Sequence, residues 1–219
     1  MAIHRQCGCD NWVMSMGGTS SYRDLPANFT VPQLVRDAVS AAERLDFGLC
    51  VRPEIGRLLG VLAAGLGSGA LIGETGTGTG AGLAWLFARA PSGCRFLSYE
   101  IDPDRAAAAR RLFADHDNVT IVTGDAAGLF ADGPFDLLVL DGGPGSGKTP
   151  DDPPVDPSKV LRPGGTVTVD DYTPATSWPP TFGDQPDTSR IHWLTHPDLH
   201  ATEVQVAPDL AVIVGRYLP

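Results

Sequence analysis

Lysine is scarce in this chain of 219 residues: it occurs only as Lys148 and Lys159, and the formal net charge at pH 7 is −10. A chain with so few cations offers no basic face for the phosphates of a nucleic acid. Long apolar segments are also missing, because glycine interrupts every stretch of membrane-spanning length, and the N-terminus has no signal-peptide core. We therefore expect a soluble cytoplasmic protein that binds neither nucleic acid nor membranes.

Paired cysteines of the kind that bind zinc are absent too. The four cysteines are Cys7, Cys9, Cys50 and Cys94; they form no Cys-x-x-Cys pair, and the first two are too close together to imply a disulfide framework. Free thiols are therefore expected. The length suits one α/β domain with a substantial core and leaves no room for a second catalytic domain, which argues against a typical two-domain dehydrogenase.

Residues 1–30 show no clear periodicity, and we predict an N-terminal extension there, either disordered or acting as a lid. A single domain should follow over residues 31–219. Within it, apolar positions at helical spacing alternate with short apolar runs, which predicts a parallel, doubly wound sheet. The predicted strands lie near 70–74, 95–101, 119–123, 135–141 and 165–170, and the predicted helices near 31–45, 53–64, 80–90, 103–115 and 187–196.

The C-terminus departs from this alternation. Two further strands, Ala201–Ala207 and Leu210–Tyr217, flank Pro208-Asp209, and so short a turn requires them to be antiparallel. The predicted fold is therefore a Rossmann-like, mostly parallel seven-stranded sheet that ends in an antiparallel C-terminal hairpin.

A glycine-rich turn, Glu74-Thr75-Gly76-Thr77-Gly78-Thr79-Gly80, joins the first strand to the helix after it. Such a turn lets a ligand approach the backbone closely, with the helix N-terminus facing it. Glu100, at the end of the next strand, is placed to accept hydrogen bonds from two ribose hydroxyls. These features predict a cofactor that contains adenosine. The spacing Gly76-x-Gly78-x-x-Ala81 also fits the dinucleotide fingerprint, so a nicotinamide enzyme is a competing interpretation.

Three later motifs separate the two interpretations. They are Thr123-Gly124-Asp125-Ala126, the strand Phe135–Asp141, and Leu161-Arg162-Pro163-Gly164-Gly165 leading into Thr166–Asp171. Their order and spacing resembles the class I S-adenosylmethionine-dependent methyltransferases, in particular the small-molecule O-methyltransferases related to catechol O-methyltransferase. The resemblance covers roughly Pro53 to the C-terminus.

S-adenosylmethionine is the cofactor that this resemblance implies. Glu74 and the glycine turn would lie by its methionine part, Glu100 would bind the ribose, and Asp125 would bind the adenine amino group. Without the resemblance, Glu100 is a solvated acid at a strand end, and Asp125 is a turn or cap residue. The implied cofactor-binding residues are Glu74, Gly76, Thr77, Gly78, Gly80, Glu100, Ile101, Asp125, Ala126 and Asp141.

Asp141, Asp170 and Asp171 fall at the carboxyl ends of adjacent predicted strands. The resemblance implies a metal site there, formed in the family by an Asp and an Asp-Asn pair; Asp171 replaces the Asn here. Hard oxygen ligands suit Mg²⁺ or another divalent cation, which would lower the pKa of the attacking hydroxyl. Two alternatives stay open: a metal-free site that binds a cationic amine, and strand-end acids that only cap the backbone.

The catalytic base is less regular. The family usually places a lysine three residues after the first metal aspartate, where this chain has Pro144. Lys148, four residues further on in a glycine-rich loop, is the substitute that we predict. Asp141 and Lys148 are therefore the candidate catalytic residues.

The segment Gly142-Gly-Pro-Gly-Ser-Gly-Lys-Thr149 also matches the phosphate-binding loop of nucleotide hydrolases, and a predicted strand precedes it. That loop requires a helix immediately after it, which Pro153-Pro154 disfavours, and Asp151 and Asp152 would repel phosphates. We prefer a mobile loop beside the active site.

The sequence thus predicts a methyltransferase that moves a methyl group from S-adenosylmethionine to a hydroxyl of a small molecule, with a divalent metal as the open question. An N-methyltransferase without a metal is the first alternative. A P-loop NTPase that uses residues 142–149 and a non-catalytic cofactor-binding module are the others. A small-molecule acceptor is the expected partner, and the resemblance adds a homodimer.

Overall fold

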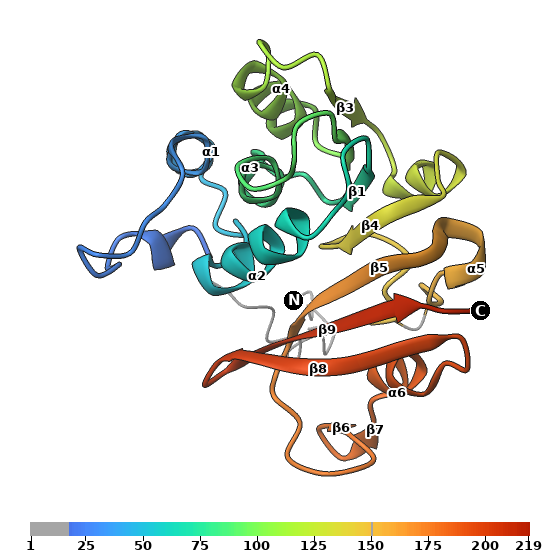
Figure 1. Cartoon of the computed structure of the whole chain (residues 1–219). Coiled ribbons are helices and arrows are strands. Elements are labelled where there is room, and N and C mark those ends of the chain that lie inside the picture. Colours follow the sequence, from blue (N-terminus) through green and yellow to red (C-terminus); the bar gives the residue numbers. More distant parts are fainter. Residues whose placement is uncertain (1–17, 150) are drawn as a thin grey trace, which may run out of the picture.

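The computed structural model describes residues 18–149 and 151–219. A seven-stranded sheet runs through the molecule, and helices cover both of its faces (Figure 1). Its strands are β1 (Leu71–Thr75), β2 (Arg95–Glu100), β3 (Val119–Thr123), β4 (Phe135–Leu140), β5 (Leu161–Tyr172), β8 (Leu199–Ala207) and β9 (Leu210–Tyr217).

The strand order is β3-β2-β1-β4-β5-β9-β8. The first five strands of the chain pair in parallel, and β9 lies antiparallel between β5 and β8. The Pro208-Asp209 turn joins β8 to β9, as its length requires. The predicted Rossmann-like fold, with its antiparallel C-terminal hairpin, is therefore confirmed.

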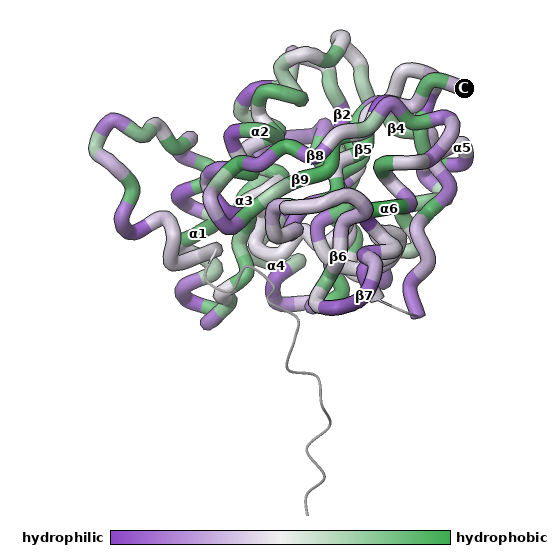
Figure 2. Tube along the Cα trace, turned by 90° about the horizontal axis from the view of Figure 1, so that it is seen from below, coloured by the Kyte–Doolittle hydropathy of each residue, from purple (hydrophilic) through white to green (hydrophobic). Residues whose placement is uncertain are grey.

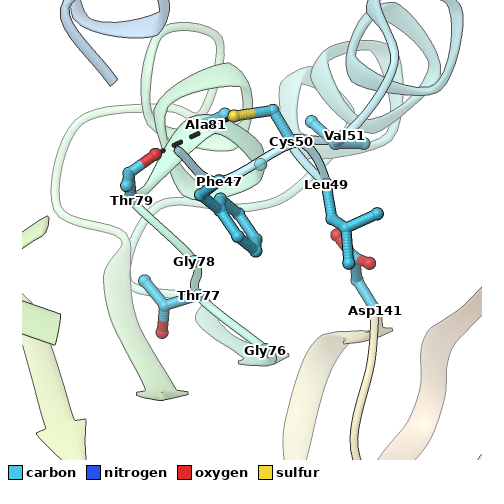
Figure 3. Close-up of a pocket in the computed structure, with 11 residues that line it drawn as sticks. Phe47, Leu49, Cys50, Val51, Gly76, Thr77, Gly78, Thr79, Ala81 and Asp141 are labelled. Atoms are coloured by element: carbon cyan, nitrogen blue, oxygen red, sulfur yellow. Dashed lines mark hydrogen bonds between the residues drawn. The ribbon is translucent and has the colours of Figure 1, made fainter. Parts of the chain in front are cut away.

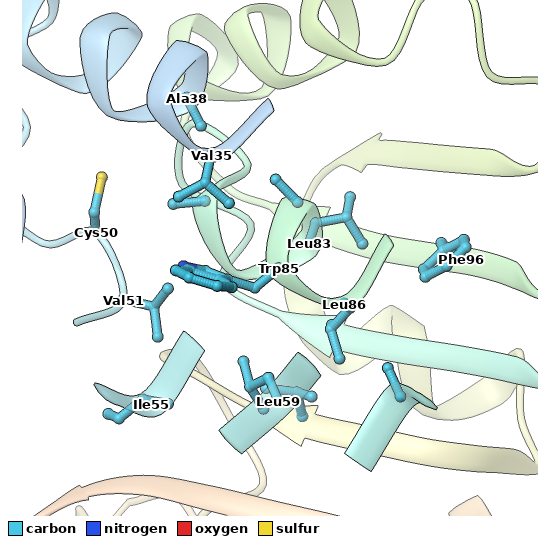
Figure 4. Packing of buried hydrophobic residues seen from close by; sticks show 14 of the residues in the cluster. Val35, Ala38, Cys50, Val51, Ile55, Leu59, Leu83, Trp85, Leu86 and Phe96 are labelled. Atoms are coloured by element: carbon cyan, nitrogen blue, oxygen red, sulfur yellow. The ribbon is translucent and has the colours of Figure 1, made fainter. Parts of the chain in front are cut away.

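One face of the sheet is covered by a cluster of helices around Trp85 (Figure 4). Trp85 is 2% exposed, and its Nε1 donates to Tyr22 Oη at 2.9 Å. Gly56 makes this packing possible, since a Cβ there would lie 2.2 Å from Trp85 Nε1. The helices on this face are α1 (Gln33–Arg44), α2 (Pro53–Ala64), α3 (Ala81–Phe87) and α4 (Pro103–Leu112).

The other face buries a second cluster, in which Trp193 of helix α6 (Thr188–Thr195) packs with Phe135 and Leu138 of β4. Figure 2 shows the contrast between the two hairpin strands: β9 is mostly hydrophobic along its length, whereas hydrophilic residues recur along the edge strand β8. Strand β8 lies at the edge of the sheet and exposes one of its faces to solvent, so hydrophobic and hydrophilic residues alternate along it. The remaining elements are the 3₁₀ turns η1 (Ser20–Tyr22) and η2 (Ala126–Ala131), the short helix α5 (Pro157–Val160), and β6 (Thr181–Phe182) with β7 (Gln185–Pro186).

Strand β5 begins earlier than the predicted 165–170, because Leu161 already pairs with Phe135 of β4. The register then shifts across Pro163-Gly164-Gly165. A Cβ on Gly165 would lie 2.8 Å from the Phe135 carbonyl oxygen, so the glycine permits this close contact. The shift sets the register that brings Asp170 to the end of the strand next to β4.

Residues 1–17 lie outside the described residues, and with them most of the predicted N-terminal extension. From Thr19 on, the chain contacts the domain: Thr19 N donates to Gly48 O at 3.1 Å, and Tyr22 Oη donates to Val51 O at 2.9 Å. The domain boundary at residue 30 stays a prediction. Among residues 18–149 and 151–219, no helix is long and apolar enough to cross a membrane.

The order of the sheet determines where a ligand can enter. Strand β1 pairs with β2 on one side and with β4 on the other, so the connections leave the carboxyl ends of these strands in opposite directions. Ligands of open α/β sheets bind in the crevice at such a switch point. The glycine turn after β1, Glu100 at the end of β2 and Asp141 after β4 all lie at this edge.

Candidate active site

The glycine turn after β1 is held against both neighbouring strands. Gly76 N and Thr77 N donate to the Tyr99 carbonyl at 3.0 and 3.1 Å. Gly76 has a φ of +76°, and a Cβ there would lie 1.9 Å from the Asp141 carbonyl oxygen. Gly78 and Gly80 also adopt positive φ, which glycine tolerates best. The glycines therefore bring the predicted cofactor turn directly against the end of β4.

Glu74 is buried beneath this turn, with 1% of its surface exposed. Ser98 Oγ donates to Glu74 Oε2 at 2.7 Å, and Thr77 Oγ1 is 2.5 Å from the same Ser98 hydroxyl. The pKa of Glu74 is raised to about 8, mainly by burial, with a contribution from the charges of Asp170 and Glu100. Glu74 Oε1 has no hydrogen-bond partner among the described residues. Glu74 therefore supports the turn from below, with one oxygen left for a ligand or for its own proton.

Glu100 lies where the sequence predicted it, and the protein itself occupies much of its carboxylate. Its Oε2 accepts from Gly78 N at 2.7 Å, which links it to the glycine turn. Its Oε1 accepts from Asp102 N at 2.9 Å and from Arg105 Nε and Nη2 at 3.1 and 2.9 Å. The sequence analysis missed Arg105, although the Asp102-Pro103 start of α4 places it on the first turn of that helix, facing back to Glu100.

Three other predicted cofactor residues lie near Glu100 with different environments. Ile101 is 69% exposed directly beyond it, so its side chain is free to contact a ligand. Asp125 is exposed and caps η2 by accepting from Ala127 N at 2.9 Å, which matches the cap interpretation. Ala126 is buried and lies against Gly143 of the loop that follows β4.

The three aspartates come together as predicted. One carboxylate oxygen from each of Asp141, Asp170 and Asp171 lies within 4.8 Å of the other two. Asp171 has a φ of +52° where the pairing of β5 with β9 becomes irregular, between Val169 and Tyr172. A bulge with left-handed backbone re-aims a side chain, and here it turns Asp171 toward the other two acids.

Crowding perturbs the titration of Asp141 and Asp170. The pKa of Asp170 is raised to about 7, mainly by burial and then by the charge of Asp171, while Lys148 partly opposes the shift. Burial also raises the pKa of Asp141 well above its usual range, with repulsion from Asp170 and Asp171 adding to it. Asp170 is 4% exposed, and its Oδ1 has no hydrogen-bond partner among the described residues. A cation bound among these acids would reduce the repulsion between them, so the cluster is a candidate cation site.

Lys148 supplies one such cation. Its Nζ donates to the main-chain carbonyl of Asp170, lies 3.7 Å from Asp170 Oδ1 and is 4.9 Å from the centre of the Tyr172 ring. The predicted catalytic lysine thus reaches the aspartates, as the sequence analysis expected of a substitute for the family lysine.

The loop that carries Lys148 makes tertiary hydrogen bonds, and its predicted mobility stays a prediction. Gly145 N donates to Asp152 Oδ1 at 2.6 Å, and Gly145 O accepts from Val155 N at 2.9 Å. The Ser146 carbonyl accepts from Ser189 Oγ and Trp193 Nε1 of α6, both at 2.8 Å. These partners come from segments remote in sequence, which is why local composition did not reveal them.

The same loop lacks the geometry of a phosphate-binding loop. Thr149 and Asp152 form an isolated antiparallel bridge, and the first helix after the loop, α5, begins at Pro157 and has four residues. In the described part of this segment no helix N-terminus follows Lys148, so the arrangement on which a P-loop depends is missing.

A cleft lies between the glycine turn and Asp141 (Figure 3). Phe47 covers Gly78, and Leu49 lies on the Asp141 side of the cleft. Cys50 Sγ is 3.8 Å from Thr79 Oγ1, which joins this segment to the turn. The sequence analysis missed Phe47 and Leu49, because the connection between α1 and α2 carries no motif. A ligand in the cleft would therefore contact both the glycine turn and Asp141.

Comparison with known proteins agrees with this geometry. Residues 74–172, from Glu74 through the last residue of β5, match the family described as a methyltransferase domain. A candidate O-methyltransferase of Mycobacterium avium is 31% identical over 144 residues, which span 61% of this chain and 63% of that protein. The chain therefore spans less than two thirds of that relative's length.

Solved structures extend the likeness to the whole fold. The O-methyltransferase TomG from Streptomyces achromogenes, solved with S-adenosylmethionine, superposes with a TM-score of 0.68 at 22% identity, over 94% of this chain and 98% of that one. The O-methyltransferase from Bacillus cereus, solved with S-adenosylhomocysteine, gives 0.65 at 18% identity, over 92% and 98%. Residues 74–172 are thus similar in sequence to a methyltransferase domain, and the chain has the fold of these solved methyltransferases, as the resemblance stated from the motifs implied.

Proposed function

We propose that this protein is an S-adenosylmethionine-dependent methyltransferase that transfers a methyl group to a hydroxyl of a small molecule. One observation carries the proposal: the cleft is lined by the glycine turn, which is tied to Glu100, and by Asp141, which belongs to the three-aspartate cluster. A cofactor bound along the turn would present its methyl group toward Asp141. The similarity to O-methyltransferases supports the same reaction.

The cofactor half of the site would bind by shape and by hydrogen bonds. Gly76 and Gly78 leave the backbone open to close approach, and Glu100 would accept from the ribose hydroxyls with its remaining lone pairs. Ile101 would lie against the adenine, and Asp125 would bind its amino group. When bound, S-adenosylmethionine supplies the reactive methyl group, so the protein has mainly to orient the acceptor.

The acceptor half would prepare the hydroxyl. Asp141, whose pKa is raised by burial and by the neighbouring acids, is suited to take the proton of the acceptor hydroxyl at neutral pH. While no metal is bound, Lys148, as a cation beside Asp170, would stabilise the negative charge that develops on the acceptor oxygen. This division of roles assigns proton transfer to Asp141 and electrostatic stabilisation to Lys148.

The aspartate cluster has a donor set that fits a hard divalent cation such as Mg²⁺. Asp141, Asp170 and Asp171 would hold it, and the unpartnered Asp170 Oδ1 supports this assignment. Bound there, the ion would hold acceptor oxygens and lower the pKa of the attacking hydroxyl. A cationic amine acceptor would satisfy the same acids without a metal, so N-methylation is the second candidate.

Isothermal titration with S-adenosylhomocysteine, with ATP in a parallel experiment, tests the proposal. We expect micromolar binding of S-adenosylhomocysteine and none of ATP, because no helix follows Lys148 in the described part of the loop. Catechol-like hydroxyl acceptors and amine acceptors are then assayed separately for methyl transfer. Binding of ATP instead would return residues 142–149 to consideration as the working site.

Two expectations from the sequence accompany this proposal. A homodimer is proposed from the resemblance, and light scattering on the purified protein measures it directly. A cytoplasmic location is proposed from composition, and fractionation of cells that produce the full chain checks it.

A further inference from the structure

Lys148 is an ion-pair partner placed inside the site that would receive a metal. Its side chain is 19% exposed, and its Nζ is 3.7 Å from Asp170 Oδ1. The ammonium also donates to the main-chain carbonyl of Asp170 and lies over the ring of Tyr172. An ammonium with these neighbours is largely removed from water, so its position depends on the acids and on the aromatic ring.

The backbone holds Lys148 in this position. Two donors on α6, Ser189 Oγ and Trp193 Nε1, converge on the carbonyl of Ser146, two residues before the lysine. Tyr172 Oη is 2.7 Å from the same Ser189 hydroxyl, so the ring beneath the ammonium and the anchor of its loop belong to one network. Lys148 is therefore attached to the acid cluster through the loop as well as through its charge.

Asp170 is only partly satisfied by this partner. The carboxylate is 4% exposed, and at 3.7 Å the ammonium is beyond hydrogen-bond distance of an Oδ1 that has no such partner among the described residues. A divalent ion binds carboxylate oxygens at roughly 2.0–2.6 Å and carries twice the charge. The oxygen can therefore exchange one cation for the other, and repulsion prevents both from sitting there together.

We propose that Lys148 is a tethered cation that competes with a divalent metal ion for the Asp141–Asp170–Asp171 cluster. The inference rests on the proposed function only in taking this cluster as the acceptor site. Lys148 balances part of the acidic charge while no metal is bound, and it must withdraw for a metal to enter. The metal affinity of the cluster is thereby set lower than that of three free carboxylates.

The test is Mn²⁺ binding, measured by the loss of the free-ion signal in electron paramagnetic resonance. Lys148→Met should raise Mn²⁺ affinity about tenfold or more, since a neighbouring charge commonly shifts an equilibrium by that much. Lys148→Arg should stay near the wild type. Lys159→Met is the matched control: it makes the same charge change at the other lysine, whose side chain is 77% exposed, and should leave the affinity unchanged.

Ser189→Ala provides a second route to the same answer if Lys148→Met folds poorly. It keeps every charge and loosens the loop, and a smaller rise in Mn²⁺ affinity is expected. Equal or weaker Mn²⁺ binding by both Lys148→Met and Ser189→Ala, or an equal rise in Lys159→Met, would overturn the proposal.

Titration of the same samples with S-adenosylhomocysteine separates the two ideas. If no sample binds it while Lys148→Met still gains Mn²⁺ affinity, the competition holds and the methyltransferase function fails. If all samples bind it while Mn²⁺ affinity is the same throughout, the function holds and the competition fails.

Discussion

The two sides of the candidate site, one around Glu100 and the other around the three aspartates, satisfy their acids in opposite ways. On the β2 side, Glu100 accepts from two backbone amides and from the Arg105 guanidinium. On the β4–β5 side, three aspartates crowd together around one ammonium, and a buried Asp170 oxygen has no hydrogen-bond partner among the described residues. The first arrangement is ordered before any ligand arrives. The second leaves a buried carboxylate oxygen available to a cation, and in the proposed function the first side recognises the cofactor and the second carries the chemistry.

The largest expected effect comes from adding a side chain where the two sides touch. Gly76→Ala would place a Cβ 1.9 Å from the Asp141 carbonyl at a φ of +76°, so the ends of β1 and β4 must separate. We expect a loss of about 3 kcal/mol or more in the free energy of unfolding, measured by urea denaturation. Gly69→Ala is the control, because Gly69 has a φ of +81° and a Cβ added there would meet nothing within 4 Å. That change should cost about 1 kcal/mol, and equal losses would contradict the steric argument.

Removing the charge of Glu100 should weaken cofactor binding while the aspartate cluster stays intact. Glu100→Gln removes the charge that Arg105 binds and leaves the guanidinium with a neutral partner. S-adenosylhomocysteine affinity should fall about 10- to 100-fold, the usual range for a lost hydrogen bond to a charged group. Calorimetric titration measures it, with Asp104→Asn as an exposed acid of the same charge on the next helix. Mn²⁺ affinity should not change, and a loss there would mean that the two sides are coupled.

Removing an acid from the aspartate cluster should raise the stability of the protein, because it relieves repulsion. The size of this effect depends on pH. The folded state raises the pKa of Asp170 to about 7 and that of Asp141 well above its usual range, so it binds protons that the unfolded chain has released above about pH 4. Stability should therefore fall as pH rises through this window, by on the order of 2 kcal/mol.

Asp170→Asn should flatten this slope and raise the free energy of unfolding at about pH 8 by about 1 kcal/mol, while methyl transfer is lost. Denaturation with urea at several pH values measures the slope. Asp125→Asn, at an exposed acid, should keep the wild-type slope. If Asp170→Asn left the dependence of the free energy of unfolding on pH unchanged, repulsion among the aspartates would not destabilise the folded protein.

The smallest change in cofactor affinity is expected at Asp125. Two roles were predicted for this acid: binding of the adenine amino group and capping of the backbone. Its carboxylate accepts from Ala127 N, and asparagine can make the same capping bond. Asp125→Asn should therefore change S-adenosylhomocysteine affinity about threefold or less. A loss as large as that of Glu100→Gln would instead support a direct contact with adenine and extend the recognition side to β3.

The ordered side of the cleft could be predicted from sequence because its requirements are local. Gly76, Gly78 and Gly80 reflect backbone conformations that other residues resist, and Glu100 follows them at a fixed distance along the chain. The strand and helix periodicities determined the sheet in the same way. Arg105 escaped attention because its partner is identified only once α4 turns back on the end of β2.

The crowded side depended on contacts between distant segments. The aspartates were predicted from their strand ends, but the attachment of the Lys148 loop to α6 joins Ser146 to Ser189 and Trp193, some forty residues away. The local sequence of that loop, rich in glycine and proline, indicated mobility and even a nucleotide site. Only the tertiary contacts show where the loop is anchored, and for the same reason Phe47 and Leu49 gave no signal in the sequence.

The scarcity of lysine has a practical consequence. The sequence holds two lysine amines, one 77% exposed on α5 and the other 19% exposed among the acids. An acylating reagent should modify the exposed amine of Lys159 faster than the largely buried amine of Lys148. The amount of Lys159 adduct therefore serves as an internal reference for the slower modification of Lys148. Whatever moves the inner amine changes that ratio in a mass spectrum. The protein thus carries a built-in reporter of site occupancy, and it can be used to screen for the acceptor before any product is known.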